Sequence, residues 1–236
     1  VVLGAGVVPG GASIAANRGR PSREVAAEFI SKKLWAEFAG TPIPEGVLDH
    51  LRSVAIANDF AITPWVRALL TRPEFYAADV RNGRVRTPVE YVVAVLVATG
   101  RRSAAATPLW LMEGMGQRPL YPPNVAGWKH NDYWVNASAM AKRTDTARSF
   151  VWRSMDGYWS GDGLIHLAGG TVSRSDVDET YRDDPRGLLD RFLDLMRITP
   201  ASATYQALLA HVEQSARWER TDVLPLILVS PEFHLA

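Results

Sequence analysis

Apolar residues recur at helical spacing along most of the chain. The stretch "REVAAEFISKKLWAEFAG", which follows Ser22, repeats its large apolar side chains near a period of 3.6 residues and ends at Gly40, which predicts one helix. No segment alternates convincingly between apolar and polar residues, as a half-buried strand would. The pattern therefore predicts an all-α protein, built as an orthogonal or irregular helical bundle. Further helices are expected over 45–58, from 63, from 87, and over 105–117, 135–153, 185–197, 202–216 and 222–229.

Two of these helix starts carry local signals. Thr63 is followed by Pro64, and proline is favoured in a first turn because the N–H that it lacks would be unpaired there. Thr87 is followed three residues later by Glu90, the spacing of a capping box in which each side chain accepts a hydrogen bond from the backbone N–H of the other residue. These signals predict helices that begin at Thr63 and Thr87.

One helical pattern occurs twice in the chain. With a shift of 158 positions, residues 41–75 lie over 199–233, and nine of the 35 pairs are identical. The matches fall at turns and helix ends, where Pro-Glu-Phe closes both copies and its proline ends the preceding helix. We therefore expect a duplicated three-helix unit that flanks a loop-rich aromatic insertion. The expected layout is an irregular lead-in segment at 1–21 and a single helical domain at 22–236, with repeat unit A at 24–75, the insertion at 76–181 and repeat unit B at 182–233.

The composition is that of an ordinary folded protein, with 47% hydrophobic and 22% charged residues, a net charge of +1 and no cysteine. A charge this close to zero gives no long-range attraction to nucleic acid, so no nucleic-acid partner is expected. The longest apolar run, "VEYVVAVLVATG", is too short to span a bilayer, so no transmembrane segment is expected. The opening "VVLGAGVVPGG" resembles a dinucleotide-binding turn, but Pro9 stands where the third glycine is required.

No motif in the sequence assembles a reaction centre. The five histidines are too far apart to place two metal ligands on one helical face. His130 and Asp132 are the nearest approach to a catalytic pair, although neighbouring loop residues of this kind are usually solvated. The segment "MDGYWSGDG" at 155–163 offers carboxylates in a glycine-rich turn but lacks the closing glutamate of a calcium loop. We therefore assign no catalytic residue, no metal site and no cofactor.

The most unusual segment is "PLYPPNVAGWKHNDYWVN", which concentrates prolines, asparagines and aromatic residues between two expected helices. In one interpretation, exposed rings stack on sugar faces while the asparagines bind hydroxyl groups. In the other, the rings fill gaps in the protein's own core and the prolines hold the shape of the loop. We favour Trp128 and Trp134 as inward anchors, with residues 130–132 as the outward tip. The candidate ligand or partner residues are Asn124, Trp128, His130, Asn131, Asp132, Tyr133, Trp134 and Asn136.

Several segments resemble, in family order, the bacterial family known as domain of unknown function 1800. They are "FISKKLWAEFAG", "RALLTRPEFYA", "RVRTPVEYVVAVLVATG", "MGQRPLYPPNVAGWKHNDYWVNASAMAKR" and the closing "LVSPEF". The resemblance implies a helical fold. It also implies an exported or cell-envelope-associated protein, because members of the family are commonly secreted and are often encoded beside a sulfatase-like protein. The resemblance brings no established activity and no catalytic residues.

From these observations we expect a non-enzymatic interaction or assembly protein that is secreted or associated with the cell envelope. Its partner is expected to be a protein, and the sulfatase-like neighbour is a candidate. The alternative is a carbohydrate-active or glycan-binding protein, a hydrolase included, with its site in the loop that contains Trp128 and Trp134. Solvent exposure of the rings in this loop distinguishes the two functions.

Overall fold

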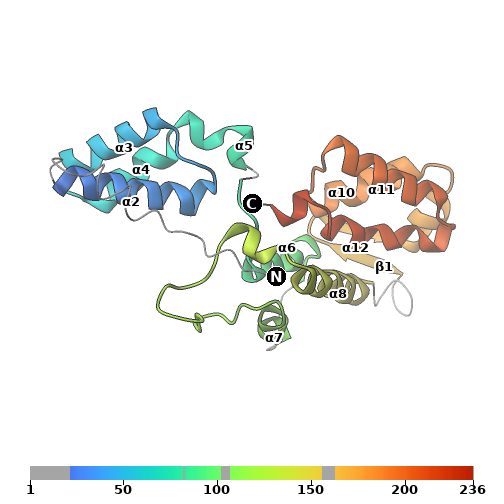
Figure 1. The fold of residues 1–236 in the computed structure, drawn as a ribbon. Helices are drawn as coiled ribbons and strands as arrows, with labels where there is room; N and C mark the ends of the chain where they lie inside the picture. Colours follow the sequence, from blue (N-terminus) through green and yellow to red (C-terminus); the bar gives the residue numbers. More distant parts are fainter. Residues whose placement is uncertain (1–21, 82, 102–106, 156–162, 236) are drawn as a thin grey trace, which may run out of the picture. The chain divides into compact units, whose positions relative to one another are not determined.

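The chain, described here as a computed structural model, consists of helices and one small β-hairpin (Figure 1). The structure describes residues 22–81, 83–101, 107–155 and 163–235. The chain forms two compact units, unit 1 up to Gly83 and unit 2 from Arg84. The predicted all-α class is confirmed. Within the described residues, no helix combines the length and the apolar character that crossing a membrane requires.

Unit 1 packs three helices around a core that contains two buried tryptophans. Its elements are α2 (Ser22–Ala39), α3 (Glu45–Ala57), α4 (Ile62–Leu70), η1 (Pro73–Tyr76) and α5 (Ala78–Arg81). Helix α3 packs against both α2 and α4, and Trp35, Leu51, Trp65 and Leu69 are each at most 1% exposed. The Nε1–H of Trp65 donates to the Oγ of Ser31, 3.1 Å away. This hydrogen bond lets an indole and a hydroxyl enter the core without an unpaired polar atom.

Helix α4 begins at Ile62, and its N-cap is Ala61 and not Thr63, two residues earlier than predicted. The two residues before Ala61 adopt φ angles of 48° and 62°, in the left-handed region. This turn brings Ala61 into the N-cap position, so that Thr63 lies within the first turn and has no capping role. Pro64 still lies in that turn, where its missing N–H removes no helical hydrogen bond.

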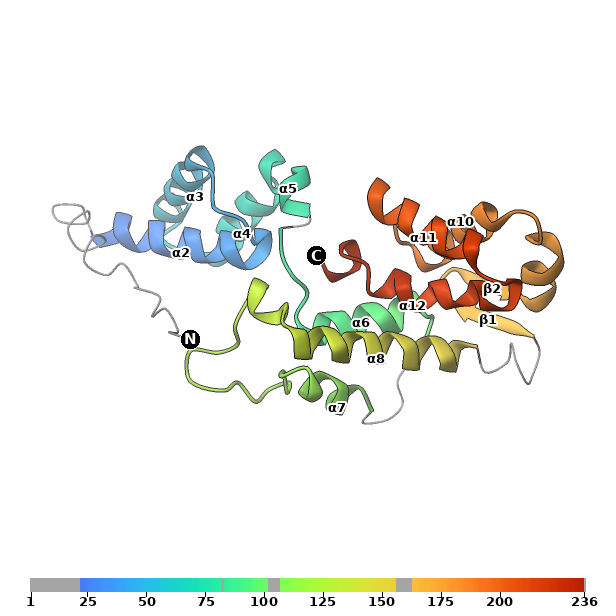
Figure 2. The same cartoon turned by 45° about the vertical axis from the view of Figure 1, so that its right-hand side comes forward.

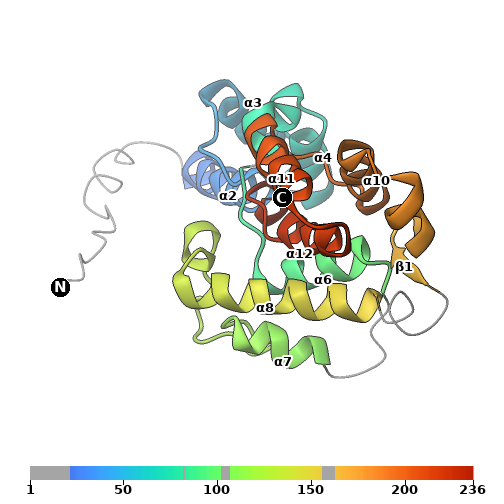
Figure 3. The same cartoon turned by 90° about the vertical axis from the view of Figure 1, so that its right-hand side faces the viewer.

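Unit 2 is larger, and its helix α8 lies alongside α6, α7 and α12 (Figures 2 and 3). Its helices are α6 (Pro88–Ala98), α7 (Thr107–Gly114), α8 (Ala137–Ser154), α10 (Pro185–Met196), α11 (Ser202–Gln214) and α12 (Val223–Leu228). Helix α8 contacts α6, α7 and α12, while α10 and α11 pack against each other and against α12. Short turns of helix complete the unit at η2 (Asn131–Trp134), η3 (Asp176–Thr180), η4 (Arg217–Asp222) and η5 (Glu232–His234).

A β-hairpin that the sequence analysis did not predict follows α8. Strands β1 (Leu164–Leu167) and β2 (Gly170–Ser173) pair antiparallel, with Ile165 opposite Val172. These two side chains are buried in the core of unit 2. Each strand has only four residues, so the alternation of buried and exposed positions is too short to stand out in the sequence.

The two ends of unit 2 pair with each other. Val85 and Leu235 form an isolated antiparallel β-bridge. Next to it, the N–H of Arg86 donates to the carbonyl oxygen of His234 at 2.8 Å. The guanidinium of Arg86 also donates to the carbonyl oxygen of Phe233 at 2.7 Å and lies over its ring. The entry and exit segments of unit 2 are therefore tied together by backbone and side-chain hydrogen bonds.

The elements of the two predicted repeats coincide when they are compared along the sequence. Moved by 158 positions, α3 falls on 203–215 and α4 on 220–228, whereas the structure has α11 at 202–214 and α12 ending at residue 228. Buried positions coincide as well: Trp35 with Leu193, Leu51 with Leu209, and Leu69 with Ile227. The duplication remains a prediction that these coinciding helix ends and buried positions fit.

Candidate functional site

The 118–136 loop connects α7 to α8, and its own polar groups hold its shape. The Oδ1 of Asn124 accepts a hydrogen bond from the N–H two residues later, at 2.9 Å. Gly127 follows at a φ of 82°, which only glycine adopts without strain. At the end of the loop, the Oδ1 of Asn136 accepts the N–H of Ala139 at 3.0 Å and caps α8. Two of the candidate ligand residues thus serve to fix the backbone.

Trp134 anchors the loop in unit 2. Its side chain is 1% exposed, and its Nε1–H donates to the carbonyl oxygen of Lys129 at 2.8 Å. Tyr133 meets the Trp134 ring edge-on, with 5.0 Å between the ring centroids, and Trp128 lies 6.3 Å from it. Trp134 therefore points inward, whereas Trp128 is half-buried and Tyr133 is 56% exposed. The rings of this loop are divided between the core and the surface.

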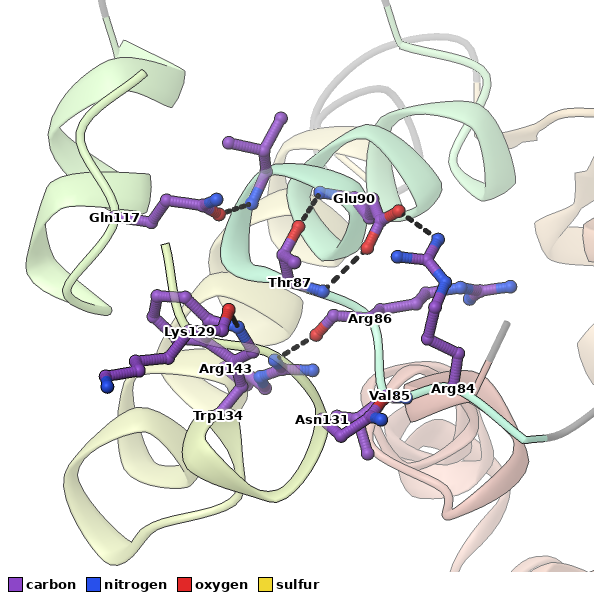
Figure 4. Close-up of polar contacts among 11 residues, drawn as sticks. Arg84, Val85, Arg86, Thr87, Glu90, Gln117, Lys129, Asn131, Trp134 and Arg143 are labelled. Atoms are coloured by element: carbon purple, nitrogen blue, oxygen red, sulfur yellow. Dashed lines mark hydrogen bonds and ion pairs between the residues drawn. The ribbon is translucent and has the colours of Figure 1, made fainter. Parts of the chain in front are cut away.

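Asn131 differs from the expectation for the outward tip, because it turns toward the segment before α6. It is half-buried at a φ of 51°, and its Oδ1 accepts the N–H of Val85 at 3.2 Å (Figure 4). Asparagine adopts this left-handed conformation more readily than most residues. His130 and Asp132, on either side of it, are exposed. The outward tip thus consists of His130 and Asp132, while Asn131 fastens the loop to its support.

The segment that Asn131 binds leads into the capping box of α6, which the sequence predicted. The Oγ1 of Thr87 accepts the N–H of Glu90 at 3.3 Å, and the Oε2 of Glu90 accepts the N–H of Thr87 at 2.8 Å. Just before the loop, the Oε1 of Gln117 accepts the N–H of Val89 at 3.0 Å. The loop is therefore fixed at two points to the same helix start (Figure 4).

Arg143 of α8 is fully buried and joins the two ends of unit 2. Its Nη2 donates to the carbonyl oxygen of Arg86 at 2.6 Å, and its Nη1 lies 3.1 Å from the Nδ1 of His234. Arginine has no acceptor, so Nδ1 accepts this hydrogen bond. The guanidinium carbon also lies 4.8 Å from the centre of the Tyr91 ring, whose hydroxyl donates to the carbonyl oxygen of Arg143. A carbonyl, an imidazole and an aromatic face thus hold the buried cation.

Arg143 and His234 were not predicted to form a pair. They are 91 positions apart, and neither belongs to a motif with a known chemistry. The available signal was their place in the segments that resemble the family, because Arg143 ends "NASAMAKR" and His234 directly follows "LVSPEF". Both side chains are buried, so the pair stabilises the part of unit 2 to which the loop is attached.

His234 is expected to make unit 2 sensitive to acid. Burial, together with the positive charge of Arg143, lowers the pKa of His234 from an ordinary 6.5 to about 4. The folded protein therefore resists protonation that the unfolded chain accepts, so this stabilisation is complete above pH 6.5 and decreases as the pH falls toward 4. The free energy of unfolding should decrease by up to about 3 kcal/mol over this range. Urea unfolding at pH 7 and pH 4.5 measures the decrease.

The matched control for this pH dependence is His234→Gln, which retains a polar side chain but does not titrate. Carboxylates and the other histidines contribute equally to both proteins, so the difference between the two profiles belongs to His234. The wild type should lose more stability than the variant on acidification. Parallel profiles would contradict the assignment.

Part of the outer side of the 118–136 loop is apolar. Leu120 is 96% exposed and Val125 is fully exposed, and the side chains of Tyr121 and Val135 are also more than half exposed. Leu120 adopts a φ of 64°, a left-handed conformation that is unfavourable for a bulky residue. A rigid loop that presents several apolar side chains to water is typical of an interaction surface.

The other segments that the sequence offered as possible metal or nucleotide sites lie outside the 118–136 loop. Across the residues that the structure describes, no three histidine, aspartate or glutamate side chains come together as a metal site requires. Most of the carboxylate-containing segment "MDGYWSGDG" falls at 156–162, outside the described residues, as does the glycine-rich stretch within 1–21. The described geometry therefore directs attention to the 118–136 loop and its support.

Comparison with known proteins gives one family match. Residues 22–235 match the family described as "Protein of unknown function (DUF1800)". The matched range contains both units, the 118–136 loop and the residues around Arg143. No curated protein and no solved structure shows a significant match to the chain.

Proposed function

The chain belongs to this DUF1800 family, and on that premise we propose that it is a non-enzymatic interaction or assembly protein, exported or associated with the cell envelope. The 118–136 loop is its binding surface and a protein is its partner, with the sulfatase-like neighbour as a candidate. The observation that carries this proposal is the exposure of Leu120 and Val125 on a loop fixed by hydrogen bonds. A preorganised apolar surface binds a protein without a large entropic cost of ordering.

The hydrogen bonds of the asparagines favour a protein partner over a sugar. Asn124 and Asn136 bind backbone N–H groups of the loop and of α8, and Asn131 binds the N–H of Val85. Their acceptor oxygens are therefore already engaged, whereas a sugar site needs polar groups that converge on the ligand's hydroxyls. Leu120 and Val125, in contrast, extend into solvent.

A glycan-binding surface is the second candidate, and the exposed rings of Tyr121 and Tyr133 support it. Aromatic rings can stack on the apolar faces of sugars. The Tyr121 ring, however, already lies under the guanidinium of Arg118, whose central carbon is 4.6 Å from the ring centre. A sugar would have only the opposite face of this ring, which makes the protein partner the better fit.

The test compares the tagged wild-type chain with a Leu120→Ser/Val125→Ser double variant, both produced in the native organism. The proteins that co-purify are identified, and the affinity of each chain for the purified partner is then measured. Loss of two exposed apolar contacts should weaken binding at least about tenfold, equivalent to about 1.4 kcal/mol. Trp152→Ser is the matched control, because Trp152 is an exposed apolar residue of α8 away from the loop.

The outcomes separate the two candidates. Weakened partner binding by the double variant, with normal binding by Trp152→Ser, supports the proposal. Equal binding by all three chains would show that another surface is used. Binding to purified cell-wall polysaccharide that disappears in Tyr121→Ala/Tyr133→Ala would instead identify the loop as a glycan site.

A further inference from the structure

Helix α4 of unit 1 presents an apolar face that the rest of the described unit leaves exposed. Ile62, Val66 and Leu70 follow one another at a spacing of four residues and so lie on one side of the helix. Ile62 is 55% exposed, and Val66 and Leu70 are half-buried. The adjacent face of the helix carries Trp65 and Leu69, which are buried in the core. The outer face lines a shallow groove of about 470 Å³, together with Thr63, Arg67 and Thr71.

The equivalent face of unit 2 shows what such a groove accepts. A shift of 158 positions places Ile62, Val66 and Leu70 on Arg220, Leu224 and Leu228. In unit 2 these three residues are 9%, 0% and 0% exposed. Helix α12, which carries Leu224 and Leu228, packs against α8 (Figures 2 and 3). Of the helices that pack against α12, α10 and α11 correspond to α2 and α3 of unit 1, whereas the amphipathic helix α8 has no counterpart there.

A tyrosine accompanies this third helix in each unit. In unit 2, the hydroxyl oxygen of Tyr91 lies 3.2 Å from the carbonyl oxygen of Leu228, beside its hydrogen bond to Arg143, and the Tyr91 ring meets Phe233 edge-on. In unit 1, the hydroxyl of Tyr76 donates to the equivalent carbonyl oxygen, that of Leu70, at 2.8 Å, and its ring meets the equivalent phenylalanine edge-on. Tyr76 nevertheless remains 57% exposed. Unit 1 thus reproduces the tyrosine contact of unit 2 but leaves the surface beside it open.

We propose that the α4 groove of unit 1 binds an amphipathic α-helix of a partner protein, packed on α4 as α8 packs on α12. Apolar side chains of that helix, spaced by three or four residues, would cover Val66 and Leu70. The helix carries a carboxylate beside its apolar stripe, because Arg67 is exposed in the groove and forms no ion pair with a described residue. Unit 2 has proline at the position equivalent to Arg67, so this charge distinguishes the ligand of unit 1 from α8 itself.

The probes for this site are two synthetic peptides. The parental peptide has the α8 sequence, residues 137–154, and the acidic peptide carries Lys142→Glu and Arg148→Glu, which replace two exposed basic side chains. Binding to the full chain is measured by fluorescence anisotropy, and amide chemical shifts report where the peptide lies. We expect saturable binding of the acidic peptide, with shift changes concentrated on α4, and a lower affinity for the parental peptide.

Three variants of the chain test the groove. Val66→Ser should weaken binding of the acidic peptide about tenfold, since it removes an apolar contact at the centre of the groove. Arg67→Glu should weaken the acidic peptide and strengthen the parental one, because the sign of the local charge is reversed. Phe29→Ser is the matched control on α2, where Phe29 is 61% exposed outside the groove, and it should bind as the wild type does.

Several outcomes would overturn the proposal. Absence of saturable binding, or binding that Val66→Ser leaves unchanged, would show that the groove is not a helix site. Concentration-dependent dimerisation that Val66→Ser abolishes would identify a second copy of the chain as the occupant. Peptide binding that occurs only after removal of residues 1–21 would identify that segment as the occupant. The result is independent of the proposed function, because the 118–136 loop belongs to unit 2 and is unchanged in all these variants.

Discussion

Replacement of Trp134 by alanine should lower the free energy of unfolding of unit 2 by about 3–5 kcal/mol. The side chain is 1% exposed, so the substitution removes a large buried ring and leaves a cavity near Gly116. It also leaves the carbonyl oxygen of Lys129 without its hydrogen bond from Nε1–H. Because Tyr133 packs edge-on against the same ring, the 118–136 loop should lose its fixed shape. Hydrogen exchange of the α8 amides measures the stability of unit 2 separately from that of unit 1.

Two further substitutions separate the contribution of the buried ring from that of the Nε1–H hydrogen bond. Trp134→Phe keeps an aromatic ring but cannot donate to Lys129, so its cost should be intermediate. Trp110→Ala removes a ring that is 60% exposed, and its cost should stay below about 0.5 kcal/mol. A Trp134→Ala protein as stable as the Trp110→Ala protein would show that Trp134 does not anchor the loop.

Replacement of Arg143 by alanine should cost about 3 kcal/mol or more in the free energy of unfolding of unit 2. The substitution leaves the carbonyl oxygen of Arg86 and the Nδ1 of His234 without their donor inside the protein. It also removes the cation from the face of the Tyr91 ring. The bridge between the two ends of unit 2 should open first, so the amides of residues 85, 86 and 235 should lose protection before those of α8.

The position of the positive charge in Arg143 matters as well as its presence. Arg143→Lys keeps the charge, but its one nitrogen cannot replace the two separate guanidinium nitrogens that contact His234 and Arg86, so most of the stability should still be lost. Arg148→Ala is the matched control, because Arg148 is exposed on the same helix, and its effect should be small. Full stability of Arg143→Lys would mean that charge alone is sufficient at this position.

Helices were predictable from the sequence where local signals agree with apolar periodicity. The capping box at Thr87 and Glu90 forms as predicted, and α10 spans Pro185–Met196 against an expected 185–197. The N-cap of α4 was predicted two residues late, because the left-handed turn before Ala61 leaves no clear mark in the sequence. The hairpin was missed for a related reason, since its strands are too short to show a period.

The contacts that support the loop were less predictable, because they join residues far apart in the chain. The loop was recognised by its composition, yet nothing local shows that Asn131 binds Val85 rather than solvent. Arg143 is exceptional in that an arginine on a helix is normally exposed, and only its tertiary contacts explain its burial. Periodicity describes which face of a helix is buried, whereas the partner of a buried polar group depends on the whole fold.

The β-bridge between Val85 and Leu235 has a consequence for how unit 2 can be rearranged, because it brings the entry and the exit of the unit together. A unit whose two ends are adjacent can be inserted into a loop of another protein, because the two ends of that loop do not have to move apart. It can also be circularly permuted, with a short glycine-serine linker joining residue 235 to residue 84. In evolution, a unit with adjacent ends can be inserted into another protein, or exchanged between proteins, as a whole.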